Sequence, residues 1–322
     1  MKPQILPPNV LKHFYEGGRR IAALRGIELE SDHMPEEWIG ATSTMFGHAE
    51  RGLSRFEDGT LVRDAVRADP EAYLGAEHTA RYGPDPGLLV KLLDAGQRLP
   101  VHFHPGRAFA REAGLDDRHG KTEAWIIVEA EPDARMWLDF KRDVELQEVR
   151  EWMRVQDSDA MLAAMHELPV FSGDVVFVPA GTAHAIGDGI LLLELQEPTD
   201  FSVLLEWDGF QLSPHDGHLK LGWDRALQAL DRHAADPPHA APTLPDEADP
   251  YFRAERISGD ARALDAGFSI VVVLDGAGTL GDLPLQRGMA VLIPYGAGET
   301  RIEGVEAIRC RPPAPDAGEG HW

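Results

Sequence analysis

The sequence contains very little cysteine and comparatively little positive charge. Cys310 is the single cysteine among 322 residues, which excludes an internal disulfide and a metal site of several cysteines and favours a reducing compartment. There are 54 acidic and 31 basic residues, giving a formal net charge of −23. Such a charge repels phosphate backbones and anionic membranes, so we expect no nucleic-acid partner and no membrane partner. An anionic substrate would need a local basic pocket.

Long apolar segments are also missing. The N-terminal stretch MKPQILPPNVLKHFYEGG has no apolar run long enough for a signal peptide, and no later segment approaches the ~20 apolar residues of a membrane-spanning helix. We therefore expect a cytoplasmic protein. With 43% hydrophobic and 26% charged residues, the chain can bury a sizeable core in one large domain or in two ordinary ones.

Many short strand-like runs separated by glycine and proline predict a mainly β chain with an antiparallel sandwich or barrel. Apolar residues at helical spacing predict a small helical insertion near 143–168, and a short amphipathic helix is expected around Val10–Tyr15. The segment 232–250 is rich in proline, alanine and aspartate, which is typical of a linker. We therefore predict a first domain over 1–231 and a second β domain over 251–322.

The two predicted domains contain related segments. GDVVFVPAGTAHAI, which begins at Gly173, aligns with GMAVLIPYGAGETRI, which begins at Gly288. In both segments a strand leads through proline and a glycine-containing turn into a returning strand. Glu299 occupies the position that His184 has in the first copy, and no His-x-His pair precedes the second copy. Only the first domain is therefore expected to bind a metal.

Four side chains form the predicted metal site. His102 and His104, in LPVHFHP, lie two residues apart and so share one face of a strand. Glu123 lies in the apolar run GKTEAW, and His184 follows the turn PAGT. Each residue alone could be a surface or packing feature. Together, three nitrogens and one carboxylate suit one divalent metal ion and leave open positions; zinc is favoured, with manganese and iron as alternatives.

Longer motifs resemble a known family. HFHPG followed by GKTEAW resembles the first cupin motif, and GDVVFVPAGTAHAIG resembles the second. More narrowly, the order and spacing from about Glu36 to Asp200, including GLLVKLLDA and ILLLELQEPTD, are similar to type I mannose-6-phosphate isomerases in their short bacterial form. The resemblance implies two jelly-roll cupin modules, the second degenerate, and metal-dependent interconversion of an aldose and a ketose, by default mannose 6-phosphate and fructose 6-phosphate.

The resemblance also implies roles for individual residues. His104, Glu123 and His184 fall on zinc ligands of the family, and Lys121 falls on the lysine that precedes the metal-binding glutamate. Asp200 matches the aspartate of the family's SSD segment. Three departures stand out: His102 replaces a glutamine ligand, Pro100 replaces a serine associated with the substrate site, and Leu204 replaces the catalytic arginine.

The replacement of the arginine keeps other functions open. An apolar side chain cannot contact a phosphate or stabilise an enediolate, so Leu204 weakens the prediction of phosphosugar activity. The partner that the resemblance implies is a small sugar or sugar phosphate. The alternatives are an isomerase or epimerase of unphosphorylated sugars and a non-catalytic sugar-binding cupin. A metal-dependent dioxygenase is a third alternative, because three histidines and a glutamate also suit iron.

Three further residues are candidates for catalysis. Lys121 lies on the same strand face as Glu123, where it could accept a proton or merely pair with a carboxylate. Glu194 points to one face of the apolar strand LLLELQE, as a base or as a partner of a ligand histidine. Asp200 could assist ring opening or cap a turn. His119 is expected on a loop rim, and Arg107 in surface salt bridges.

Overall fold

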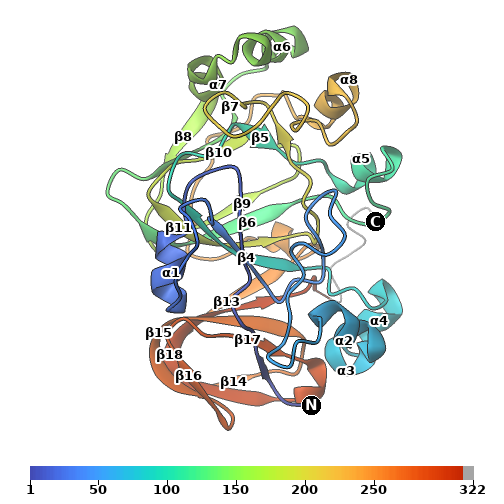
Figure 1. Ribbon diagram of the computed structural model, residues 1–322, viewed down its shortest axis with the longest axis vertical. Coiled ribbons are helices and arrows are strands. Elements are labelled where there is room, and N and C mark those ends of the chain that lie inside the picture. Colours follow the sequence, from blue (N-terminus) through green and yellow to red (C-terminus); the bar gives the residue numbers. More distant parts are fainter. Residues whose placement is uncertain (315–322) are drawn as a thin grey trace.

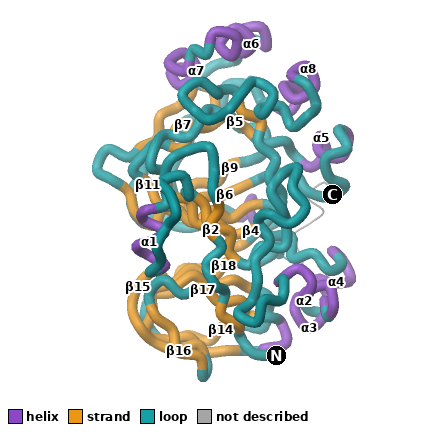
Figure 2. The backbone as a smooth tube through the Cα atoms, viewed as in Figure 1, coloured by secondary structure: helices purple, strands orange, loops and turns teal. Residues whose placement is uncertain are grey.

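The computed structural model describes residues 1–314 and consists mainly of β-strands arranged in three sheets, as the sequence predicts (Figure 1). Two of the sheets form a first module and the third sheet forms a second module below it in the view of Figure 1. Most strands are connected through loops rather than helices, as the tube in Figure 2 shows. The part of the predicted C-terminal domain after residue 314 lies outside the described residues.

The first module is built from a six-stranded and a five-stranded antiparallel sheet that share one apolar core. The larger sheet has the order β2-β3-β4-β11-β6-β9, and its strands are β2 (Val10–Leu11), β3 (Glu36–Ile39), β4 (Leu89–Ala95), β6 (Glu123–Ala130), β9 (Val175–Val178) and β11 (Ile190–Gln196). The smaller sheet has the order β12-β5-β10-β7-β8, and its strands are β5 (His102–Phe103), β7 (Arg135–Phe140), β8 (Met165–Pro169), β10 (His184–Ile186) and β12 (Val203–Leu204).

The central strands β4 and β11 are buried on both faces, which explains why their sequences are nearly continuous apolar runs. On β11, Leu192 packs into the core between the two sheets, whereas Leu193 packs against the second module. Because successive side chains alternate between faces, Glu194 points in the same direction as Leu192. The same alternation on β4 turns Lys91 towards the interior of the first module together with Leu93.

The second module is a seven-stranded sheet that includes a strand from the N-terminus. Its strands are β1 (Gln4–Ile5), β13 (Arg253–Ser258), β14 (Arg262–Leu264), β15 (Ser269–Leu280), β16 (Leu283–Gln286), β17 (Ala290–Ile293) and β18 (Thr300–Arg311). Strand β1 pairs with β17, so the first residues of the chain lie in this sheet. The related segments beginning at Gly173 and Gly288 form β9–β10 and β17–β18, and Glu299 is exposed immediately before β18.

Helices are short and lie outside the sheets. They are α1 (Arg19–Arg25), α2 (Val62–Ala68), α3 (Pro70–Leu74), α4 (Ala76–Tyr82), α5 (Arg107–Glu112), α6 (Leu146–Val155), α7 (Ser158–Ala164) and α8 (Trp223–Ala226), with 3-10 turns at η1 (Leu227–Ala229), η2 (Asp246–Ala248) and η3 (Tyr295–Ala297). Helices α6 and α7 cap the end of the first module that lies away from the second (Figure 1). No helix among residues 1–314 is long and apolar enough to cross a bilayer.

Two local predictions are corrected by the structure. The helical insertion predicted near 143–168 ends at Ala164, because Met165–Pro169 alternates between the two faces of a strand and pairs with β7. The helix predicted around Val10–Tyr15 is wrong, because Val10–Leu11 pairs with β3. A helix of that length has too few hydrogen bonds to outweigh strand pairing.

The predicted linker 232–250 is mostly irregular and follows the surface of the first module. Backbone hydrogen bonds connect Ala235 to Phe140 and Ala241 to Val175. A single apolar core also joins the two modules, with members such as Leu92 from the first and Leu292 from the second. The domain boundaries at 231 and 251 stay a prediction.

Candidate functional site

Three histidines converge between the two sheets of the first module. His102 lies on β5 and is directly opposite His184 on β10, while His104 follows two residues after His102 on the same side. One ring nitrogen from each lies within 4.8 Å of the others, and all three side chains are buried. Among the residues that the structure describes, this is the one cluster of three or more such groups that could hold a metal ion.

The backbone fixes how each imidazole presents its nitrogens. The Nδ1 atoms of His102, His104 and His184 lie 2.7 Å from Pro100 O, 2.7 Å from Phe201 O and 2.9 Å from Thr182 O. A carbonyl oxygen accepts only, so each Nδ1 must carry the proton and each Nε2 must present a lone pair.

The nitrogens with lone pairs face one another. Nε2 of His184 lies 2.9 Å from Nε2 of His102. Burial lowers the pKa of all three imidazoles well below the ordinary value, so the rings are neutral at physiological pH. Two neutral acceptors cannot hydrogen-bond to each other, and such an arrangement is stable when a cation lies between them.

Glu123, the first residue of β6, completes this group. Its Oε2 lies 3.1 Å from His104 Nε2, and its Oε1 lies 3.4 Å from His184 Nε2. Burial would raise the pKa of Glu123, but the charge of Lys121 and a hydrogen bond from Glu194 together outweigh that effect and hold the pKa below the ordinary value, so the carboxylate is ionised. Three neutral nitrogens and one anionic oxygen fit a divalent transition metal. The hydrogen bonds from Nδ1 to backbone carbonyls are the orientation that metal-binding histidines require.

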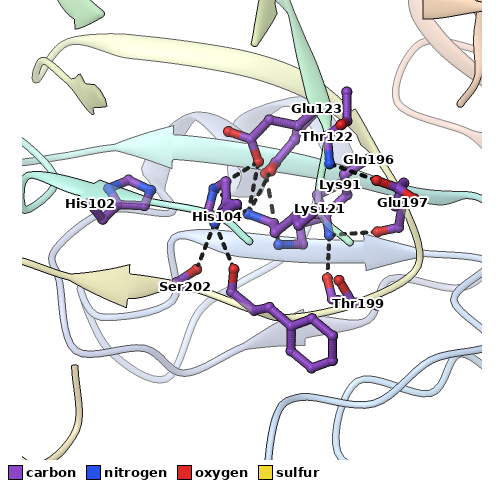
Figure 3. A network of polar contacts seen from close by, with 12 residues as sticks. Lys91, His102, His104, Lys121, Thr122, Glu123, Gln196, Glu197, Thr199 and Ser202 are labelled. Carbon is purple, nitrogen blue, oxygen red and sulfur yellow. Dashed lines mark hydrogen bonds and ion pairs between the residues drawn. The ribbon is translucent and has the colours of Figure 1, made fainter. Parts of the chain in front are cut away.

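Two lysines and Glu194 extend the site. Lys91 lies on β4, Glu194 lies on β11, and Lys121 lies two residues before the start of β6. Figure 3 shows both lysines together with His104 and Glu123. Lys121 Nζ lies 2.8 Å from Glu123 Oε2, 2.9 Å from His104 Nε2 and 3.5 Å from Glu194 Oε1. Lys91 Nζ lies 3.8 Å from the other oxygen of Glu194. Burial raises the pKa of Glu194 to about 7, and the neighbouring Glu123 carboxylate adds to the effect. Glu194 can therefore carry or release a proton near neutral pH.

The residues around Lys91 were not singled out from the sequence. Glu36 on β3 lies 3.5 Å from Lys91 Nζ and accepts hydrogen bonds from the Tyr15 hydroxyl at 2.6 Å and the Trp38 indole at 2.9 Å. Burial would lower the pKa of Lys91, but Glu194 and Glu36 outweigh it and raise the pKa above the ordinary value. The sequence does contain a signal for this network. Lys91 lies inside the apolar run LLVKLLDAG, and a lysine buried in such a strand almost always has an acidic partner.

A cavity of about 380 Å³ opens onto these groups. Its wall includes the three candidate catalytic residues Lys121, Glu194 and Asp200, together with His102 and Glu123. Asp200 is half-buried, and its Oδ2 accepts a hydrogen bond from the backbone N–H of Phe46 at 3.1 Å. Five of the seven site residues predicted from sequence therefore line one cavity, and the other two, His104 and His184, contact Glu123 next to it.

Leu204 and Pro100 also line this cavity. Strand β12 pairs with β5 so that Leu204 lies directly opposite His102. Residues directly opposite one another on antiparallel strands point to the same face, so Leu204 faces the cavity next to the imidazole. The position at which the family resemblance places an arginine is therefore part of the cavity wall.

A second buried network holds the loop that carries Lys121. Glu197 accepts hydrogen bonds from the Arg107 guanidinium at 2.5 Å and the Thr122 backbone at 2.9 Å. Gly120 is required here, because a Cβ atom at this position would lie 2.6 Å from Arg107 N. The expected surface position of Arg107 is wrong, since its side chain is buried, and His119 is buried against Asp85 at 2.7 Å rather than exposed on a loop rim.

Comparisons with known proteins agree with this geometry. No family model matches the sequence. A mannose-6-phosphate isomerase of Streptococcus mutans is 31% identical over 205 residues, which cover 62% of this chain and 58% of that protein, so the match spans less than two thirds of that relative. The mannose-6-phosphate isomerase ManA of Bacillus subtilis is 30% identical over 235 residues, which cover 67% of this chain and 72% of the relative.

Solved structures share the whole fold. The crystal structure of the Bacillus subtilis mannose 6-phosphate isomerase matches with a TM-score of 0.76 and 21% identity, covering 96% of this chain and 99% of that one. A mannose 6-phosphate isomerase bound with zinc and yttrium matches with a TM-score of 0.69 and 15% identity, covering 98% and 100%. These likenesses confirm the cupin fold that the sequence predicts.

Proposed function

Because this chain belongs to the type I mannose-6-phosphate isomerase family, whose members are sugar-phosphate isomerases, we propose that it is a metal-dependent isomerase that interconverts an aldose and its ketose. The names of its relatives make mannose 6-phosphate and fructose 6-phosphate the default pair. The observation that carries the proposal is the convergence of three unprotonated Nε2 atoms and the Glu123 carboxylate beside the cavity.

His102, His104, Glu123 and His184 would hold one divalent ion, and a zinc-containing structural neighbour favours zinc. When bound, the ion would polarise the two sugar oxygens at carbons 1 and 2 and spread the charge of the developing enediolate. The open cavity beside His102 leaves room for those oxygens. The protein's own part is to orient the imidazoles through Pro100 O, Phe201 O and Thr182 O.

Lys121 is the proposed carrier of the carbon-bound proton. Isomerisation removes a proton from carbon 2 of the aldose and returns it to carbon 1, while the hydroxyl proton passes between the two oxygens. Lys121 Nζ lies beside Glu123 and His104, so it faces the place where carbons 1 and 2 would lie when their oxygens approach the ligands. A positioned amine in its neutral form can accept that proton.

Glu194 and Asp200 have proposed supporting roles. Glu194 lies between Lys91 and Lys121, and its raised pKa allows it to exchange a proton with Lys121 near neutral pH. Asp200 lies on the same cavity wall, where its carboxylate could assist opening of the sugar ring in addition to accepting the Phe46 N–H.

The test is an assay of the purified protein after removal of metal and reconstitution with zinc or manganese. Mannose 6-phosphate and the free aldoses mannose and lyxose are offered in parallel, and ketose formation is measured. Metal-dependent turnover of any of them supports the proposal, and Glu123→Gln should abolish it. If no sugar is converted at any metal loading, the isomerase proposal fails, and the alternatives of a sugar-binding cupin and a metal-dependent dioxygenase stand.

A further inference from the structure

Acidic side chains outnumber lysines and arginines in the described lining of the cavity. Five carboxylates contribute to its wall, but only two of the described lysines do. The carboxylates belong to Glu36, Glu123, Glu194, Asp200 and Asp216, and the lysines are Lys91 and Lys121. No arginine is among the described residues that line it. A phosphate group is normally held by arginine, lysine or helix N-termini, so this lining is unusual for a phosphate site.

Both lysines already have carboxylate partners. Lys91 lies between Glu36 at 3.5 Å and Glu194 at 3.8 Å, and Lys121 lies between Glu123 at 2.8 Å and Glu194 at 3.5 Å. All five of these side chains are buried. A phosphate would have to displace a carboxylate from one of the lysines, which would leave a buried charge without a partner.

The wall next to the metal ligands is apolar. Leu204 lies opposite His102 and Pro100 lies two residues before it, so neither position offers a donor from a side chain. Phe14 and Leu219 continue the apolar lining. An arginine at position 204 would point into this space and could pair with an anion. Leucine offers no positive charge or hydrogen-bond donor to an anion bound there.

The outer part of the cavity offers hydrogen-bonding groups that suit hydroxyls. His13 lines it, is largely buried, and its Nδ1 atom has no hydrogen-bond partner among the described residues. Gln211 and Asp216 line the exposed rim. The pKa of Asp216 is held below the ordinary value by hydrogen bonds from Ser213, so this rim carries a negative charge. Carboxylates and imidazoles accept hydrogen bonds from hydroxyl groups, but Asp216 repels a phosphate.

Nearby cations lie outside this cavity. Arg63 and Arg67 line a neighbouring cavity, which shares Met45, Phe46 and Asp200 with this one. Lys220 is exposed, with its Nζ 5.6 Å from the ring of Phe46, and is not part of the cavity wall.

We infer that the cavity selects a sugar without a phosphate group, a free aldose and its ketose, over the corresponding sugar phosphate. The inference rests on the proposed isomerase function, because it concerns the substrate of the same site. Three observations support this inference. Carboxyl groups outnumber lysines and arginines in the described lining, both lysines are paired with carboxylates, and the wall at Leu204 is apolar. The sugar hydroxyls would donate to the carboxylates and to His13, while the same carboxylates would oppose an added dianion.

The test compares kcat/KM for mannose and for mannose 6-phosphate in the zinc-loaded protein. We expect the free sugar to be preferred by at least about tenfold. A preference for the phosphate ester would overturn the inference and leave the isomerase proposal intact. Lys220→Ala is expected to leave the preference unchanged, and selective loss of turnover of the phosphate ester in this variant would also contradict the inference.

A binding measurement separates the substrate class from catalysis. The shift in Tm of the zinc-loaded protein is measured with D-mannitol and with D-mannitol 1-phosphate, which have no carbonyl group and cannot be isomerised. We expect a larger shift with mannitol at equal concentration. If no sugar is turned over but mannitol still gives the larger shift, the isomerase proposal fails and the choice of a neutral ligand stands. A larger shift with the phosphate would refute that choice.

Leu204→Arg tests the apolar wall directly, with Leu204→Gln as a control that adds polarity and similar bulk without charge. The arginine variant should raise kcat/KM for mannose 6-phosphate relative to mannose by about tenfold, and the glutamine variant should not. Equal effects of both variants would show that charge at this position does not decide the substrate. The thermal shift with mannitol 1-phosphate reports on the folded variant even when its turnover is low.

Discussion

His102 and His184 lie directly opposite each other on β5 and β10, with their Nε2 atoms 2.9 Å apart. In each ring the Nδ1–H group donates a hydrogen bond to the backbone carbonyl two residues earlier. Both Nε2 atoms therefore present lone pairs to the same point. The strand pairing therefore fixes the orientation of two of the predicted ligands before any ion binds. This preorganisation reduces the entropy that binding must overcome.

Replacement of a predicted metal ligand should weaken metal binding while the protein stays folded. His184→Ala is expected to lower zinc affinity by more than about 100-fold, because one of four donors is lost. Zinc per chain is measured by elemental analysis after dialysis against a weak chelator. His215→Ala, at an exposed histidine, is the matched control and should retain the wild-type zinc content. Wild-type zinc content in His184→Ala would contradict the predicted site.

The two interpretations of Lys121, as a proton acceptor and as a partner of carboxylates, predict different effects when arginine replaces the lysine. If Lys121 accepts a proton, both Lys121→Met and Lys121→Arg should lower kcat by about 100-fold or more with zinc content unchanged, because arginine cannot be deprotonated. If it only pairs with Glu123 and Glu194, Lys121→Arg should recover most of the activity. The measurement is kcat at saturating substrate, and Lys141→Met at an exposed lysine is the control.

Much of the site could be predicted from sequence because its residues lie in motifs with fixed spacing. The i, i+2 relation of His102 and His104 and the turn before His184 put those groups on defined strand faces. Leu204 could be recognised as a departure for the same reason. Glu36 and Lys91 were missed, because their proximity depends on the register of β3 against β4, which no local pattern specifies.

Local patterns also failed where long-range pairing decides the structure. The apolar spacing in Val10–Tyr15 is compatible with a helix, but Val10 and Leu11 form an edge strand on β3 and Tyr15 donates to Glu36. Arg107 follows a loop and suggested an exposed cation. Its partner Glu197 lies 90 residues later in the chain, so the burial of this pair could not be derived from either segment alone.

Lys91 is expected to be structurally important because it neutralises two buried carboxylates. Lys91→Met should lower the free energy of unfolding by roughly 3–5 kcal/mol, since Glu36 and Glu194 would lose their shared cation. The double variant Lys91→Met with Glu36→Gln should recover part of this loss. Urea unfolding of the metal-free protein measures both, with Lys12→Met at the surface as the control. An unchanged free energy of unfolding in Lys91→Met would show that the carboxylates are not held by this lysine.

His119 should make stability depend on pH in the alkaline range. Burial would lower its pKa, but hydrogen bonds to Asp85 and Glu197 outweigh that effect and raise the pKa to about 9. The ordinary value in the unfolded chain is about 6.5. The folded state therefore binds the proton more tightly, so the contribution to stability is fully present below pH ~6.5 and is lost as the pH rises to about 9.

The expected loss across this window is roughly 3 kcal/mol in the free energy of unfolding, measured by urea titration at several pH values. His119→Gln keeps a side chain that can hydrogen-bond but cannot ionise, so its stability should be lower at pH ~6.5 and should change much less up to pH ~9. His239→Gln, within the predicted linker, serves as the control and should keep the wild-type slope. If His119→Gln shows the same slope as the wild type, another group must titrate in this range, and the charged pair of His119 with Asp85 does not stabilise the loop that carries Lys121.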